Sequence, residues 1–201
     1  MPHAARRLHA WLIFDVGQKM KDLLEAARRE AVATLSAAIN PGAIGEPALR
    51  AADGSIVFDP QGLQTPLRKD VARKEGESWV TANVDARGIR VSSPLRIIWD
   101  EKLVLSIASV TWDYVTFSVA PSAAARDFGS IREWFLRWFD PDNRRVTSPE
   151  GLSGVVHFLS DPECRDGRWQ LIVDFGSAPT HAFEELLDCF VALGFTDCEV
   201  R

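Results

Sequence analysis

Hydrophobic positions in the first forty residues repeat in two different ways. Residues 8–16, LHAWLIFDV, form a short continuous apolar run with aromatic and β-branched members, and Gly17 follows it. Such a run predicts a buried strand. Residues 18–38 contain neither Gly nor Pro, and their apolar side chains recur at steps of three and four, which predicts an amphipathic helix. The stripe of this helix consists of Met20, Leu24, Ala27, Ala31, Leu35 and Ala38.

Residues 40–78 show no sustained pattern. Glycine and proline recur throughout, and only SIVF at 55–58 has the composition of a short strand. Because Gly and Pro mark turns, we expect a loop or linker region here. From Trp79 onward the pattern predicts a β-meander, with Pro94 at a sheet edge or bulge because it lacks an N–H donor. The meander strands are expected at 79–85, 89–93 and 95–99.

The carboxyl-terminal half alternates strand and helix patterns more regularly. Residues 103–120 form a long strand-like run that we expect to bend near residues 111–113. Helical periodicity follows at 130–139 and again at 183–193, where the last helix ends at Gly194. The remaining apolar runs predict strands at 152–160, 168–175 and 195–200.

Taken in order, residues 112–201 read strand, helix, strand, strand, helix, strand. This order resembles the ferredoxin-like fold, in which two helices pack on one face of an antiparallel sheet of order 4-1-3-2. We therefore predict an α+β protein in which a strand, a long helix and a β-meander precede a ferredoxin-like βαββαβ module. Residues 1–78 would pack as a strand, helix and loop region on residues 79–201, as two units or as one compact domain. The resemblance implies no particular function.

Alternation along the predicted strands assigns side chains to two faces of the sheet. The face toward the helices is apolar and contains Val115, Phe117, Val119, Trp169, Leu171, Val173 and Phe175. The opposite face is half apolar and contains Trp112, Tyr114, Thr116, Val155, His157, Leu159, Gln170, Ile172 and Asp174. Monomers rarely expose such a patch, so it either binds a partner or lies under the helix predicted at 18–38; we favour the second.

The composition is that of an ordinary globular protein, but the charge is unevenly distributed. The chain has 201 residues, 46% of them hydrophobic, and a formal net charge of −5. Residues 1–106 carry 15 Lys+Arg and 13 Asp+Glu, whereas residues 107–201 carry 8 and 15. An acidic half repels phosphate backbones, so we expect no nucleic-acid partner. The acidic excess either serves solubility alone, which is the simpler interpretation, or favours a basic protein partner. No apolar run approaches the roughly 20 residues of a membrane span, so no membrane association is expected.

Cysteine usage favours a reducing, cytoplasmic location. Cys164, Cys189 and Cys198 are odd in number and lack the close pair spacings of zinc sites and redox dithiols. The apolar run near the amino terminus stops at Asp15, which is too short for a secretory core.

No catalytic signature is present, so no catalytic residue, metal or cofactor is predicted. The sequence contains no GxSxG, P-loop, GxGxxG or kinase motif. His181 and Glu185 have helical i, i+4 spacing, but one such pair is weak evidence for a metal. His157 and Asp174 could face each other with Cys164 in the loop between them, although a buried, hydrogen-bonded His157 is the simpler interpretation.

These observations favour a non-enzymatic, cytoplasmic protein-binding module of acidic inhibitor or immunity type, which engages a basic partner or a second copy. Trp79 and Trp112 are the tryptophans least committed to the core, and exposed tryptophan is typical of interaction hot spots. The alternative is a small enzyme or ligand binder with a pocket around His157 and Asp174. The candidate surface in either case consists of Trp112, Tyr114, His157 and Asp174.

Overall fold

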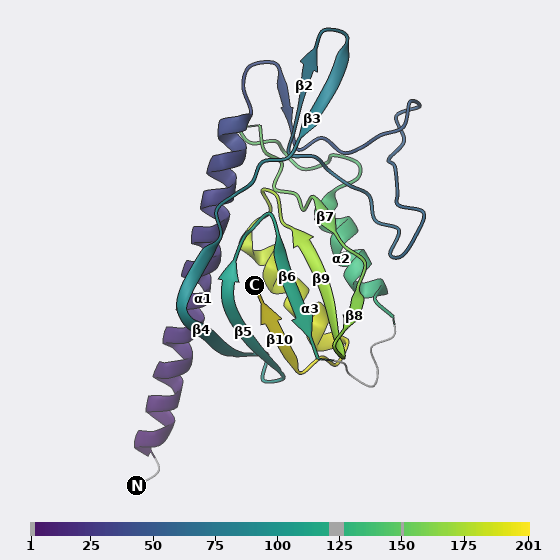
Figure 1. Ribbon diagram of the computed structural model, residues 1–201. Coiled ribbons are helices and arrows are strands. Elements are labelled where there is room, and N and C mark those ends of the chain that lie inside the picture. The colour runs from purple at the N-terminus through teal and green to yellow at the C-terminus, as the bar shows by residue number, and fades with distance from the viewer. Residues whose placement is uncertain (1–2, 121–126, 150) are drawn as a thin grey trace.

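The structure is a computed structural model that describes residues 3–120, 127–149 and 151–201, with side chains from residue 16 onward. These residues form an α+β fold with two separate sheets and three helices (Figure 1). The helices are α1 (His3–Ala38), α2 (Gly129–Phe139) and α3 (Thr180–Ala192). The α+β class predicted from the sequence is confirmed, as are the helices expected at 130–139 and 183–193.

Helix α1 continues without interruption through Gly17. The strand predicted at residues 8–16 is therefore wrong. A short apolar run does not distinguish a strand from a helix segment, and the Ala, Leu, Arg and Lys residues around it favour a helix. A single internal glycine lowers helix stability by only about 1 kcal/mol, so Gly17 does not end the helix.

The apolar stripe of α1 is buried, as its spacing predicts. Met20, Leu24, Ala27 and Ala31 lie in the main hydrophobic core, which α2, α3 and one face of the large sheet also line. Helix α1 therefore packs on the same side as the other two helices (Figure 1). The expectation that residues 18–38 cover the opposite face is wrong.

The small sheet is built from the region expected to be a linker and from the first predicted meander strand. Its strands β1 (Ala43–Gly45), β2 (Val71–Glu75) and β3 (Ser78–Ala82) pair antiparallel in that order. Strands β2 and β3 form a hairpin that projects from the body of the molecule (Figure 1). Between β1 and β2 the chain makes only isolated bridges, such as the one between Arg50 and Ile56.

The large sheet has seven strands in the order β4-β5-β10-β6-β9-β7, with β8 also paired to β9. Four of them, β10-β6-β9-β7, follow the expected order 4-1-3-2. However, the sheet extends past β10, which is parallel to β5, so a ferredoxin-like module is not confirmed. The strands are β4 (Ile89–Trp99), β5 (Leu103–Val110), β6 (Val115–Val119), β7 (Phe158–Leu159), β8 (Glu163–Arg165), β9 (Arg168–Asp174) and β10 (Asp197–Val200).

Two predicted stretches are divided differently in the structure. The strands expected at 89–93 and 95–99 are one edge strand, β4, whose register against β5 shifts between Arg90 and Leu95. Pro94 lies at this irregularity, as its missing donor predicts. The single bent strand expected at 103–120 is two strands, β5 and β6, and β10 lies between them.

The helix-facing side chains of β6 and β9 form the centre of the core, as predicted. Phe117, Phe175 and Phe183 are fully buried, and their ring centroids lie 5.2 to 6.2 Å apart. Trp112 is also buried here, stacked on Phe175 at 4.7 Å. Its predicted place on the opposite face is therefore wrong, because residues 111–114 form a turn in which strand alternation does not hold.

The opposite face of the large sheet is open. Tyr114 is 58% exposed, and Thr116, Gln170 and Ile172 are partly exposed. Three further residues predicted on this face are instead buried, two because they precede β7 and the third because it pairs with Val173, whose side chain faces the core. These three are Val155, His157 and Leu159.

Candidate functional site

Five ionisable side chains gather at the end of the large sheet next to the small sheet. Each comes from the end of an element or from a turn: Glu46 follows β1, Asp70 precedes β2, Asp113 precedes β6, His157 precedes β7, and Asp174 ends β9. We call Glu46, Asp70, Asp113, His157 and Asp174 the His157 cluster.

His157 is completely buried between carboxylates. Its Nε2 donates to Oε1 of Glu46 at 2.9 Å, and its Nδ1 donates to Oδ1 of Asp70 at 2.8 Å. Oδ2 of Asp174 lies 3.6 Å from Nδ1. Both ring nitrogens therefore face acidic oxygens, an arrangement that suits an imidazolium rather than a neutral ring.

The carboxylates of Glu46 and Asp70 are also held by backbone donors. Glu46 accepts from the N–H groups of Ser153 and Ser177, and Asp70 accepts from the N–H of Val84. A buried carboxylate is tolerated when its oxygens are hydrogen-bonded in this way. The network links residues 46–84 to the carboxyl-terminal half of the chain.

The turn after β9 lies directly against the imidazole. Gly176 has a φ of +49°, and a Cβ there would come 2.4 Å from Cδ2 and Nε2 of His157. Only glycine permits both this backbone conformation and this close approach. The chain therefore closes around His157 on this side.

The charges around His157 shift two pKa values. Burial lowers the pKa of His157, but the charge of Asp174 and the carboxylates of Asp70 and Glu46 outweigh it, so the pKa lies well above 6.5. Burial raises the pKa of Glu46, but the hydrogen bond and charge of His157 reverse this effect and the pKa lies below its ordinary value. The pair is therefore ionised at neutral pH.

This pair makes stability depend on pH in two directions. Because the pKa of His157 is raised on folding, its contribution is complete below its unfolded value of 6.5 and is lost as pH rises through the raised value. Because the pKa of Glu46 is lowered, its contribution is complete above 4.5 and is lost as pH falls through the lowered value. In urea titrations in EDTA-containing buffer, we expect the urea concentration at the unfolding midpoint to be highest between pH 4.5 and pH 6.5, where both contributions are complete. A His157→Gln variant serves as the control, and an alkaline decline of the same size in both proteins would contradict this assignment.

Asp113 and Asp174 complete the cluster on the side toward α1. Oδ2 of Asp113 accepts from the N–H of Ala86, and Oδ1 of Asp174 accepts from the N–H of Gly176. Burial raises the pKa of Asp113, and the charges of Asp174 and Asp70 add to this effect. The three aspartates line a small cleft of about 10 Å³, whose other walls are Ala31, Leu35, Val84, Ala86 and Gly176.

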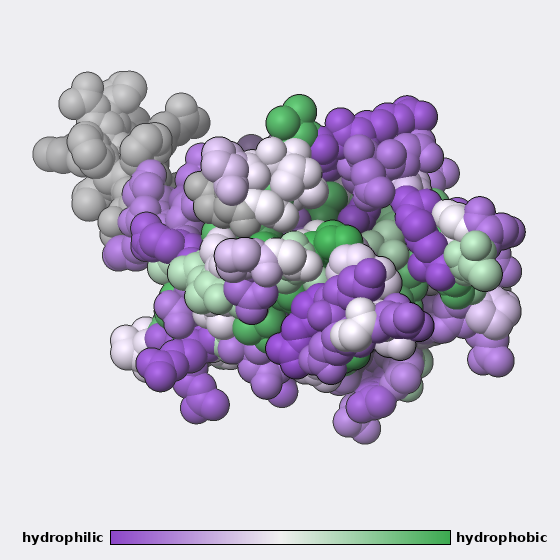
Figure 2. Space-filling view, turned by 90° about the horizontal axis from the view of Figure 1, so that it is seen from above, coloured by the Kyte–Doolittle hydropathy of each residue, from purple (hydrophilic) through white to green (hydrophobic). Residues whose placement is uncertain are grey.

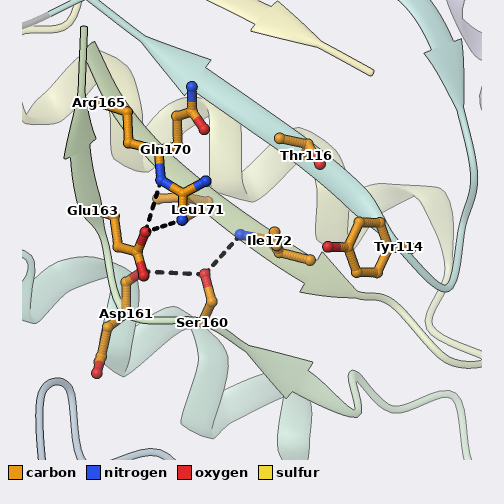
Figure 3. A pocket seen from close by; sticks show the side chains of 9 residues that line it. All are labelled: Tyr114, Thr116, Ser160, Asp161, Glu163, Arg165, Gln170, Leu171 and Ile172. Atoms are coloured by element: carbon orange, nitrogen blue, oxygen red, sulfur yellow. Dashed lines mark hydrogen bonds and ion pairs between the residues drawn. The ribbon is translucent and has the colours of Figure 1, made fainter. Parts of the chain in front are cut away.

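The structure separates the four residues predicted as a common surface. His157 and Asp174 are in contact, but His157 and Trp112 are buried. Of the four, only Tyr114 is exposed, and it lines a hollow of about 220 Å³ on the open sheet face (Figure 3). In this hollow Arg165 pairs with Glu163, and Oγ of Ser160 accepts from the N–H of Ile172.

The two weaker chemical candidates from the sequence are not assembled into sites. Cys164 lies opposite Trp169, near the other end of β9 from Asp174, so it does not join His157 and Asp174. His181 does contact Glu185, at 3.1 Å, but that carboxylate also accepts from Arg137 and Trp138. This surface pair is already satisfied within the protein.

The sequence analysis missed Glu46, Asp70 and Asp113. Glu46 and Asp70 lie in the region rich in Gly and Pro, where no periodicity assigns a side chain to a face. Arg68 was missed for the same reason, although it is 5% exposed. Its guanidinium donates to the carbonyl oxygens of Glu46, Phe139 and Asp140, and to Oδ1 of Asn143.

Comparisons with protein-family models, curated proteins and solved structures give no match for this chain. Among the helices in the part of the chain that the structure describes, none combines the length and apolar character needed to cross a bilayer.

Proposed function

We propose that this protein is a non-enzymatic protein-binding module that adds an extended, basic segment of a partner protein to the free edge of β3. The observation that carries this proposal is the exposure of β3: all five of its residues are exposed, and it lies at the edge of the small sheet. The N–H and C=O groups along a free sheet edge pair readily with a further strand.

Strand β3 lacks the features that usually protect an edge. Natural edge strands carry charged residues, proline or a bulge that discourage pairing. The sequence of β3 is SWVTA, and its register against β2 is regular throughout. The hairpin also projects from the body of the molecule, so a partner strand would meet little steric obstruction (Figure 1).

Exposed hydrophobic side chains accompany this edge. Trp79 is 53% exposed, and Ile44 of β1, at 48%, lies on the same face of the small sheet. Figure 2 views the molecule from the end that carries β2 and β3 and shows hydrophobic side chains among mainly hydrophilic ones. An exposed tryptophan beside a free edge supports an anchor for a partner side chain.

The charges near β3 are mixed, because β2 carries Arg73 and Lys74 opposite Val80 and Trp79, but carboxylates lie at both ends of the strand. Glu77 precedes the strand and Asp85 follows it, and both are exposed. Lys or Arg side chains of an added strand would meet these carboxylates, and a cation can stack on the Trp79 ring. The acidic excess of residues 107–201 would add long-range attraction.

The enzymatic alternative has less support. A substrate would have to reach His157, whose side chain is completely buried among its partners. The hollow of about 220 Å³ on the open sheet face is lined by Tyr114 but not by His157 or Asp174.

We further propose a ferredoxin-like unit within the large sheet and a reducing, cytoplasmic location. The order β10-β6-β9-β7 and the two helices between these strands support a ferredoxin-like unit extended by β5 and β4. The three cysteines, which form no disulfide, support a reducing cytoplasmic location.

A variant in β3 tests the binding proposal. The protein is used to capture its partner from native lysate, and captured proteins are cross-linked to map the contact. Trp79→Lys places a charge on the edge and removes the anchor, so we expect recovery to fall about tenfold or more. The matched control is Ile98→Lys, which changes an equally hydrophobic and more exposed residue of β4. Recovery should also fall when the salt concentration is raised.

Three results would contradict this function. The first is equal recovery by the Trp79→Lys and Ile98→Lys variants. The second is a protein that is monomeric and without a partner at low ionic strength. The third is a dimer detected by light scattering that Trp79→Lys dissociates, because the edge would then pair with a second copy instead of a basic partner.

A further inference from the structure

Three metal-binding side chains of the His157 cluster converge on one point. Nδ1 of His157 lies 2.8 Å from Oδ1 of Asp70 and 3.6 Å from Oδ2 of Asp174. One ligand atom from each of the three residues lies within 4.8 Å of the others. Bonds of about 2.0–2.2 Å to a metal place neighbouring ligand atoms about 3.0–3.6 Å apart, so the Asp174 oxygen already has a suitable spacing and the hydrogen-bonded Asp70 oxygen would have to move slightly away from Nδ1.

The cluster also contains a buried oxygen without a hydrogen-bond partner. Oδ1 of Asp113 is inaccessible to solvent and has no donor among the residues that the structure describes. Buried polar atoms are nearly always satisfied, so an orphan carboxylate oxygen indicates a missing donor or ion. The small cleft reaches Asp113, Asp70 and Asp174 together, and its volume of about 10 Å³ is close to that of one water or one ion.

Negative charge exceeds positive charge at this place. His157 is the only cationic group among the five members of the cluster, and it faces carboxylates on both ring nitrogens. The nearby guanidinium of Arg68 donates to carbonyl oxygens and to Asn143, and its charge acts on Glu46 but not on the three aspartates of the cluster. A bound cation would balance the remaining charge.

We infer that Asp70, Nδ1 of His157 and Asp174 bind one divalent cation of the Mn²⁺ or Zn²⁺ class, next to the cleft that Asp113 also lines. Carboxylates alone suit Mg²⁺ or Ca²⁺, whereas a set that includes imidazole suits Mn²⁺, Fe²⁺ or Zn²⁺. The site contains no residue of β3, so it can be tested separately from the proposed binding function.

The cation would have a structural role. Asp70 and Asp113 hold the N–H groups of Val84 and Ala86, which lie in the segment that leaves β3. A metal between Asp70 and Asp174 would tie that segment to the end of β9. Nδ1 of His157 can bind a metal only without a proton, so a proton and a cation compete for this atom.

Direct titration tests the site. The protein is stripped with EDTA, dialysed, and titrated with MnCl₂ and ZnCl₂ by calorimetry, with bound Mn²⁺ followed by electron paramagnetic resonance. We expect saturable binding of one cation per chain for at least one metal. Asp174→Asn and Asp113→Asn should each weaken binding by about tenfold or more. Asp166→Asn, in an exposed turn, is the matched control and should bind like the wild type.

A measurement on the wild-type protein guards against variants that fold poorly. The ¹⁵N shift of Nδ1 of His157 reports whether this nitrogen carries a proton or binds a metal, and it should change on adding one equivalent of cation. The inference fails if neither cation binds saturably, if Asp174→Asn binds as the wild type does, or if Nδ1 stays protonated with excess cation. None of these results depends on whether β3 binds a partner.

Discussion

Replacing His157 by leucine is expected to lower the free energy of unfolding by about 3–5 kcal/mol, the range observed when one partner of a buried ion pair is removed. In the variant, the buried carboxylates of Glu46 and Asp70 lose the imidazole nitrogen that each contacts in the wild type. Leucine cannot hydrogen-bond to either, and backbone donors satisfy only part of their capacity. Urea denaturation followed by circular dichroism measures the loss.

His181→Leu is the matched control for this experiment. His181 is exposed and contacts Glu184 and Glu185 on the surface of α3. Surface ion pairs contribute about 0–1 kcal/mol, so this variant should unfold close to the wild type. A His157→Leu protein that unfolds within 1 kcal/mol of the His181→Leu protein would show that the buried network is not a main source of stability.

His157→Gln separates hydrogen bonding from charge. Glutamine can donate to one of the two carboxylates but carries no positive charge. We therefore expect a loss smaller than that of the leucine variant and a weaker dependence on alkaline pH. The comparison shows how much of the contribution of His157 depends on the imidazolium.

Local periodicity predicted the elements that pack on the core. The spacing of Phe183, Leu186 and Phe190 identifies α3, and the alternation of Val115, Phe117 and Val119 identifies β6. These local patterns hold in the structure because the apolar side chains on one face of each element are buried together. They report which face is buried but not which strand lies beside which.

The pairing of β10 with β5 could not be read from the sequence in the same way. Val104 and Asp197 are opposite each other in this parallel pair, although they lie far apart along the chain. Neither strand contains a turn signal that would specify the partner, since a parallel pair needs no hairpin. The sheet therefore continues beyond the strands that sequence order suggested.

The candidate site was only half predictable, for a physical reason. His157 and Asp174 were identified because they are polar residues in or next to strand patterns. Glu46 and Asp70 are equally buried in the structure but lie in irregular chain, where burial depends on contacts between distant segments. Isolated charged residues in a stretch rich in Gly and Pro are thus candidates for buried anchors as well as for solvated loops.

Replacing Arg68 by lysine should lower the free energy of unfolding by about 2–4 kcal/mol, because buried carbonyl oxygens are left without donors. The guanidinium makes four hydrogen bonds. One is to Glu46, directly after β1, and three are to residues at and just after the end of α2. It also lies over the Phe139 ring at 4.7 Å. An ammonium group is a compact donor and cannot span the same acceptors.

The effect of Arg68→Lys should be concentrated in the segment that Arg68 anchors. The amides of Glu46, Leu49 and Lys69 donate within this segment, and hydrogen exchange there should accelerate more than in β6 and β9. Arg50→Lys is the control, because Arg50 is exposed and belongs to the same segment. Equal acceleration in β6 and in residues 46–69 would mean that Arg68 stabilises the fold as a whole. Unchanged exchange would mean that the hydrophobic contacts of Ile56 and Leu63 hold the segment without it.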